Sequence, residues 1–193
     1  MGTSAIASAM TVDPAASAWL SSWVTRSIGA GGEGHSLKGP GHSGRSVFVM
    51  EFSNTLTIRR PPGEVFQFLA NLENVPKWNY AIVETRKVSD GPVAIGSIYQ
   101  QVRSVPQRSE ESLEVVELEP DRRFAVRGDL GPFTGTLTYE LDDVDGSTQL
   151  TNSARLQGRG AMKLAAPLAE SRVRQAVASN LQVLKPMLES GSA

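Results

Sequence analysis

Residues 161–190 carry the longest regular pattern of apolar positions in the chain. Apolar side chains recur there at spacings of three to five residues, which places one apolar stripe along an α-helix. The stripe consists of Leu164, Leu168, Val173, Val177, Leu181, Leu184 and Leu188, and the other face carries Glu170, Arg172, Arg174, Asn180, Lys185 and Glu189. The pattern predicts a long C-terminal helix whose apolar face is covered by the rest of the chain. Pro167 predicts a kink, or a separate short turn, because it has no N–H to donate.

Alternation of apolar and polar residues predicts seven strands upstream of this helix. In the clearest one, Phe133–Asp142, apolar residues and a glycine alternate with threonines and acids, so one face is dry and one is wet. From Gly96 onward the strands follow one another at about ten residues, which indicates an antiparallel meander rather than βαβ units. The predicted strands are Glu51–Ile58, Tyr80–Ser89, Ser97–Val105, Glu110–Leu118, Arg123–Leu130, Phe133–Asp142 and Thr148–Gln157.

Two short helices are predicted between the first two strands. Pro61 and Pro62 end the first strand because a proline cannot donate to the ladder, and Pro62 can open a helix. The helix that follows has an apolar face, and residues 75–78 can form a second turn. That apolar face consists of Val65, Phe66, Phe68, Leu69 and Leu72. The order of elements is therefore strand, two short helices, six strands and long helix, which is an α+β arrangement.

Residues 1–49 differ in kind from the rest of the chain. Gly, Ser and Ala dominate them, which is linker composition, so we expect a disordered tail over 1–49 and one domain over 50–193. A short helix bracketed by Asp13 and Gly29 would present Trp19 and Trp23 as a flap or a membrane-surface anchor. The alternative, which we favour, is that this segment lies upstream of a functional start at Met50.

Composition limits the catalytic and metal-binding chemistry that the domain can perform. The chain has no cysteine, and both histidines, His35 and His42, lie in the tail, so the domain cannot build a Cys-His or Ser-His-Asp arrangement. We expect no metal and no cofactor. The net charge of −1 offers no field for nucleic acid, and no run approaches the ~18 apolar residues of a membrane span. We expect a cytoplasmic protein, monomeric or weakly dimeric.

Four short motifs, in their order and spacing, resemble the START-like, helix-grip superfamily and its polyketide cyclase/dehydrase and lipid-transport branch. They are Pro61–Phe66, Pro76–Trp78, Gly91-Pro92 with Gly96-Ser97, and Glu117–Pro120 followed by Arg122–Phe124. The resemblance covers Phe52 to Ser190. It implies a curved antiparallel sheet of about seven strands, with two short helices after the first strand, wrapped around the C-terminal helix and enclosing a cavity. Members of the superfamily bind lipids, sterols, polyketides, quinones or plant hormones; some catalyse and many only carry.

Three functions follow from this resemblance. The first is binding or carriage of a small hydrophobic molecule of the lipid, quinone or polyketide class, which the lack of histidine and cysteine favours. The second is a polyketide cyclase or dehydrase that uses acid–base residues of the cavity, because a correctly folded poly-β-ketone needs only one base and one oxyanion donor. The third is a co-chaperone-like interaction domain, which an exposed apolar patch would favour.

Polar residues that interrupt apolar strand faces indicate where the ligand lies. Asn152 shares a face with Leu150, Ala154 and Leu156, and a buried amide without partners costs about 1–3 kcal/mol. We expect Asn152 to bond to a second such amide, Gln100, to a water or to a polar group of a ligand. We hold a satisfied core amide and a ligand contact level.

The other candidate binding residues follow the same logic. Gln100 is predicted to face the same core, beside Ile98 and Val102, and Tyr139 to present its hydroxyl there. Trp78 and Tyr80 are expected to close the mouth, although a tryptophan can equally pin a helix to a sheet. Met162 and Leu168 are expected to supply apolar wall from the helix. Arg103 and Glu114 are the candidates for acid–base catalysis if their strands have the opposite phase.

Overall fold

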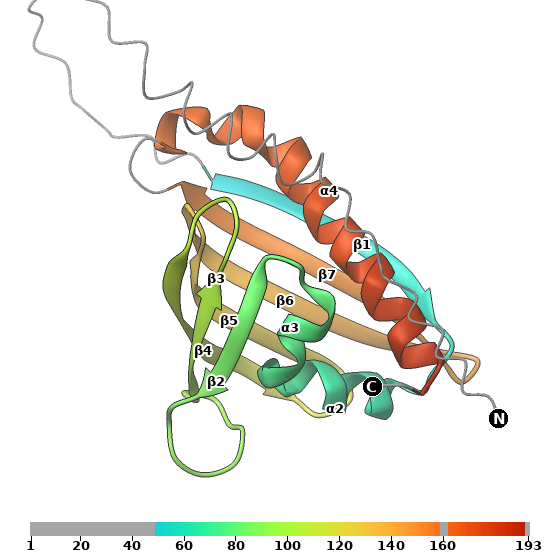
Figure 1. The fold of residues 1–193 in the computed structure, drawn as a ribbon. Helices are drawn as coiled ribbons and strands as arrows, with labels where there is room; N and C mark the ends of the chain where they lie inside the picture. Colours follow the sequence, from blue (N-terminus) through green and yellow to red (C-terminus); the bar gives the residue numbers. More distant parts are fainter. Residues whose placement is uncertain (1–48, 159–161, 192–193) are drawn as a thin grey trace, which may run out of the picture.

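A computed structural model of the chain describes residues 49–158 and 162–191, with side chains for 49–158 and 170–191. These residues form one seven-stranded antiparallel sheet, three short helical segments and one long helix (Figure 1). The elements are β1 (Val49–Ile58), α2 (Pro62–Ala70), η1 (Leu72–Asn74), α3 (Val75–Trp78), β2 (Ile82–Lys87), β3 (Ile98–Arg103), β4 (Ser109–Glu119), β5 (Arg123–Leu130), β6 (Phe133–Val144), β7 (Ser147–Gly158) and α4 (Met162–Glu189).

The predicted helix-grip fold is confirmed. The strand order in the sheet is β1-β7-β6-β5-β4-β3-β2, so the first strand returns beside the last and the meander fills the rest. Helix α4 lies along β1 and β7 across one face of the curved sheet (Figure 1). The first strand begins at Val49, and Met50 is already fully buried within it. The predicted tail and its tryptophans lie outside the described residues, so their role stays a prediction.

The sequence explains where helix α2 begins and which of its faces is buried. Pro61 has the extended backbone of an N-cap and Pro62 is the first helical residue, where a missing N–H costs nothing. The apolar face then points into the core, because Val65, Phe66 and Leu69 are all buried. Helix α2 and the turns η1 and α3 thereby cover the part of the sheet that α4 leaves open.

Two glycines allow the sheet to bend. Gly128 on β5 and Gly135 on β6 lie opposite each other, and the same row continues to Leu113 on β4 and Leu156 on β7. A Cβ atom at either glycine would lie 2.0 Å from a carbonyl oxygen of the neighbouring strand, so only glycine permits this approach of the backbones. The sheet therefore curves along a row whose two leucines line the cavity described below.

The C-terminal half of α4 fills the core. Leu181, Leu184 and Leu188 are at most 5% exposed and pack with the buried residues of α2 and the inner face of the sheet. The helix continues through Pro167 as one element, so the separate turn predicted as an alternative there does not form. No helix in the described ranges, 49–158 and 162–191, is long and apolar enough to cross a membrane.

The C-terminal end of α4 is tied to the loop after β1. The Arg60 guanidinium donates to the carbonyl oxygens of Leu188 (3.0 Å) and Glu189 (3.1 Å), which are among the last carbonyls of the helix. The backbone N–H of Arg59 donates to the Glu189 carboxylate at 2.9 Å. These bonds fix one end of the helix against the sheet.

Replacing Leu184 tests this packing. Leu184→Ala should lower the free energy of unfolding by about 2–5 kcal/mol, because the side chain is fully buried and its removal leaves a void. Gln182→Ala, an exposed position two residues earlier, should change it by less than about 0.5 kcal/mol. Urea unfolding followed by circular dichroism measures both. Equal effects of the two substitutions would contradict the packing of α4 described here.

Candidate functional site

A cavity of about 200 Å³ lies between the sheet, the turns η1 and α3, and helix α4. Most of its wall is apolar, with a polar end formed by Asn79, Gln101 and Arg103, while Tyr139 on β6 lies away from that end. The apolar residues are Leu72, Val75, Trp78, Ala81, Val105, Pro106, Leu113, Val126, Leu130, Pro132, Phe133, Leu137, Leu156, Val173, Ala176 and Val177. The polar residues are Asn79, Tyr80, Gln101, Arg103, Tyr139, Arg172 and Asn180. An apolar cavity with a few polar groups is the usual form of a small-molecule site.

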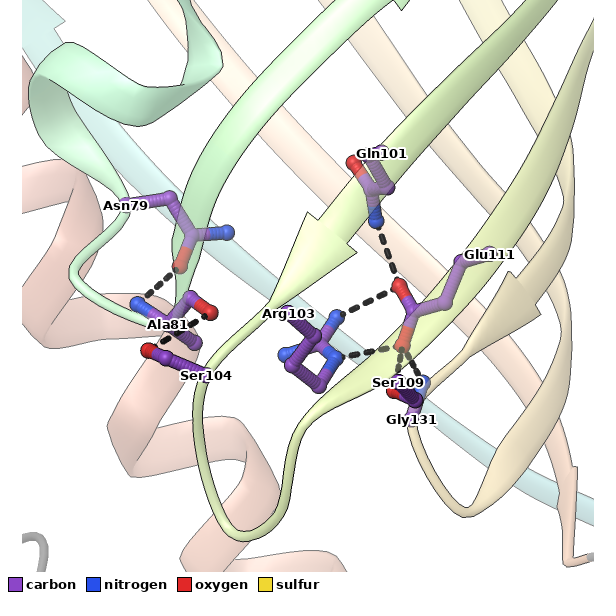
Figure 2. A network of polar contacts seen from close by, with 8 residues as sticks. All are labelled: Asn79, Ala81, Gln101, Arg103, Ser104, Ser109, Glu111 and Gly131. Carbon is purple, nitrogen blue, oxygen red and sulfur yellow. Dashed lines mark hydrogen bonds and ion pairs between the residues drawn. The ribbon is translucent and has the colours of Figure 1, made fainter.

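A buried carboxylate organises the polar end. Glu111 on β4 has a side chain that is 2% exposed and lies directly opposite Gln101 on β3. Its oxygens accept hydrogen bonds from Gln101 Nε2 (2.6 Å), from Arg103 Nε (2.6 Å) and Nη2 (3.2 Å), and from the Gly131 backbone N–H (2.6 Å) (Figure 2). The Ser109 hydroxyl adds a fifth bond at 3.3 Å. A carboxylate out of water requires such compensation.

The ion pair with Glu111 fixes the Arg103 guanidinium at the cavity wall. Two of its nitrogens bond to Glu111, and the side chain is 15% exposed. In Figure 2 the third nitrogen, Nη1, points away from Glu111, and within the described residues it bonds to no other group. Arg103 therefore presents two free N–H donors beside Tyr80, whose pKa is raised by burial and lowered in smaller measure by the Arg103 charge.

Tyr139 brings a second hydroxyl to the cavity. Its ring is 7% exposed and stacks on Phe124, with 6.1 Å between the ring centroids. Burial raises the pKa of Tyr139 far above its ordinary value. The hydroxyl thus stays protonated and can donate a hydrogen bond at any physiological pH.

An amide pair joins α4 to the segment after α3. Asn180 Nδ2 donates to Asn79 Oδ1 at 3.1 Å, and the same oxygen accepts from the backbone N–H of Ala81 at 3.1 Å. Asn180 is only 8% exposed, which corrects its placement on the wet face of the helix. The helical pattern placed it with the charged residues because an amide resembles them in polarity, yet its partner lies on the sheet side.

Asn152 is buried on the predicted face but lies beside the cavity rather than in its wall. It is fully buried and stands opposite Tyr139 in the β6–β7 register. Its Nδ2 donates to the Thr138 carbonyl oxygen at 3.3 Å, whereas its Oδ1 makes no hydrogen bond within the described residues. Asn152 is therefore a core amide beside a residue of the cavity wall, not part of the wall itself.

The prediction that Gln100 faces the core is wrong. It is exposed on the outer face of β3, where Arg86 Nη2 donates to its Oε1 at 2.8 Å. The inward residues of this strand are Tyr99 and Gln101, with Arg103 next in phase. Gln100 and Asn152 cannot meet, because three strands separate β3 from β7. The hydrophobic pattern fails on β3 because its inner face forms the polar end of the cavity.

Of the other predicted site residues whose side chains are described, four line the cavity and one does not. Trp78, Tyr80, Tyr139 and Arg103 all line the cavity. Glu114 faces outward, where Arg127 Nη2 donates to it at 2.9 Å, so a cavity role for Glu114 is wrong.

The side chains of Met162 and Leu168 lie outside the described part of α4, so their placement stays a prediction.

The sequence did not predict four polar residues of this site: Gln101, Glu111, Asn79 and Asn180. The cue for Glu111 was its position opposite Gln101, which requires the register of β3 and β4 and not the sequence alone.

Comparison with known proteins agrees with this geometry. The sequence profile of the family described as polyketide cyclase/dehydrase and lipid transport matches residues 49–189. No curated protein matches the chain.

Solved structures resemble the chain at low sequence identity. The Zhui aromatase/cyclase from Streptomyces sp. R1128 has 15% identity and a TM-score of 0.59, over 75% of this chain and 93% of that one. A START superfamily protein from Mycobacterium smegmatis has 11% identity and a TM-score of 0.62, over 73% and 98%. A Staphylococcus aureus protein of unknown function has 12% identity and a TM-score of 0.61, over 76% and 98%. At these identities the likeness shows the fold alone.

A double-mutant cycle tests the Arg103–Glu111 pair. Glu111→Leu should lower the free energy of unfolding by about 3–5 kcal/mol, because it leaves the Arg103 charge mostly buried without a partner. The double variant with Arg103→Met should recover part of this loss. The exposed pair Arg127–Glu114 is the matched control, and its removal should change stability by less than about 1 kcal/mol. Strict additivity of the Arg103 and Glu111 substitutions in urea unfolding would rule out the coupling.

Proposed function

Because the chain belongs to the polyketide cyclase/dehydrase and lipid transport family, we propose that it binds a small hydrophobic molecule in the cavity and acts as a carrier or binding protein. The observation that supports this most is the cavity itself, whose wall is mostly apolar. Burial of an apolar ligand there would contribute about 25 cal/mol per Å² of apolar surface removed from water.

The size of the cavity supports a compact ligand. Its volume of about 200 Å³ is modestly larger than the roughly 150 Å³ that accommodates benzene, and below the usual range for drug-sized ligands, about 300–1,000 Å³. We therefore propose a ligand of one or two rings rather than an extended acyl chain.

The titratable side chains of the wall support binding over catalysis. They are Tyr80, Arg103, Tyr139 and Arg172. Burial raises the pKa of both tyrosines, so they donate protons to hydrogen bonds and do not act as bases. Arg103 donates as well. Tyr80 and Arg103 suit an oxygen at one end of a bound ring, whereas Tyr139 lies further along β6, away from that end.

A cyclase-type enzyme is the second candidate, and one observation favours it. Glu111 orients Arg103 so that two free N–H donors face the cavity, which is the arrangement that stabilises an enolate oxygen as it develops. A proton acceptor for the attacking carbon would then have to come from the substrate or from a bound water. Binding and transport of a ligand need no proton acceptor, so a carrier or binding protein remains the first proposal.

Filling the cavity from the helix tests the proposed site. Ala176 lines the cavity on α4, and Ser179 lies exposed on the same helix. Ala176→Phe should weaken binding of naphthalene at least tenfold, because the added ring occupies the ligand volume. Ser179→Phe should leave the dissociation constant within a factor of two. Both are measured by titration with tryptophan fluorescence, with melting temperatures recorded to confirm folding.

Two outcomes would contradict the proposal. One is wild-type protein that gives no saturable signal and no thermal shift with naphthalene, since a ligand that binds only the folded state must stabilise it. The other is equal weakening by the two phenylalanine substitutions, which would place the binding site outside the cavity.

A further inference from the structure

A single backbone N–H fixes the orientation of both cavity amides. The Ala81 N–H can only donate, so the Asn79 atom that it contacts at 3.1 Å must be the oxygen. Asn180 contacts the same oxygen at 3.1 Å and must therefore present its nitrogen to it. The two lone pairs of Asn79 Oδ1 are then both used. The remaining atoms of the pair are Asn79 Nδ2 and Asn180 Oδ1, a donor and an acceptor.

These two atoms are available to a ligand. Within the described residues neither one makes a hydrogen bond, and both side chains line the cavity. In Figure 2 the Asn79 nitrogen points away from Ala81, toward the side on which Gln101 and Arg103 lie. Asn180 is 8% exposed, and its oxygen is not among the buried side-chain atoms that lack a partner in the described residues, so it stays accessible at the cavity wall. A ligand that supplies a donor there replaces a bond to water, whereas a ligand without one leaves the oxygen unpaired.

The complement of this pair is an acceptor next to a donor on one edge of a flat ring. A cyclic amide has this edge, because its carbonyl oxygen and its N–H lie side by side in the plane of the ring. A carboxylate fits less well, because it would bring negative charge against the Asn180 oxygen. A carboxylate also has no N–H or O–H to donate to that oxygen.

We propose that Asn79 and Asn180 form the specificity-determining pair of the cavity, and that they select neutral molecules of one or two rings that carry a cyclic amide edge. The inference rests on the proposed binding function and adds the chemical class of the ligand. In the complex, Asn79 Nδ2 donates to the ring carbonyl and the ring N–H donates to Asn180 Oδ1. The apolar wall, with Val126, Leu137 and Val177, covers the rest of the ring.

A series of ring compounds tests the pair with wild-type protein. 2-Quinolone carries both groups, 1-methyl-2-quinolone lacks the donor, and 3-methyl-2-quinolone has the same added methyl but keeps the N–H. Naphthalene has neither group. We expect 2-quinolone and 3-methyl-2-quinolone to bind at least tenfold more tightly than 1-methyl-2-quinolone and naphthalene, measured by calorimetric titration. Loss of the N–H leaves the Asn180 oxygen unpaired in the complex.

A variant tests the other half of the contact. Asn79→Asp keeps an oxygen for Ala81 and Asn180 but replaces the free nitrogen with a second oxygen. It should weaken 2-quinolone binding at least tenfold and change naphthalene binding less than threefold.

The outcomes separate the two proposals. Equal affinities of 2-quinolone and 1-methyl-2-quinolone, with naphthalene still bound, would overturn the specificity of the amide pair and leave the binding function standing. Failure of all four compounds to bind wild-type protein would overturn both proposals. Asn79→Asp that folds, by its melting curve, and binds 2-quinolone as wild type does would also overturn the role of the pair.

Discussion

The five hydrogen bonds to the buried Glu111 carboxylate are the interaction on which the polar end of the cavity depends. They fix Gln101 and Arg103 on β3 and Gly131 in the turn between β5 and β6. A buried carboxylate whose partners are displaced carries a penalty of several kcal/mol, so the network resists rearrangement. As a result, Arg103 and Gln101 are oriented before any ligand arrives, and binding does not have to order them.

The apolar part of the cavity exists because the side chains along one face of α4 differ in length. The C-terminal half of α4 presents Leu181, Leu184 and Leu188, which reach the sheet and fill the space. One and two turns earlier, the same face presents Val177 and Val173, which are shorter and only partly buried. The helix is therefore anchored at its C-terminal end and leaves a cavity under its middle, without any change in its apolar periodicity.

The sequence predicts the fold well because periodicity and turn chemistry both report on it directly. Asp-Gly is a typical two-residue hairpin turn, and Asp145-Gly146 between β6 and β7 has positive φ at both residues, 53° and 77°. Periodicity fails where a strand faces a polar part of the cavity. On β3 the apolar residues Ile98 and Val102 suggested the wrong inner face, because two of the inward residues, Gln101 and Arg103, are polar and bond to Glu111 on the next strand. Asn180 was misplaced for the same reason, since its partner Asn79 is far away in sequence and no local pattern indicates it.

The proposed ligand ring lies in this cavity, between the sheet and the middle of α4. Nuclear Overhauser effects between the protons of bound naphthalene and assigned methyl groups of the protein test it most directly. We expect contacts to Val126 on β5, Leu137 on β6 and Val177 on α4, all of which line the cavity. Contacts confined to the exposed side chains of Val83, Val88 and Ile95 would contradict it.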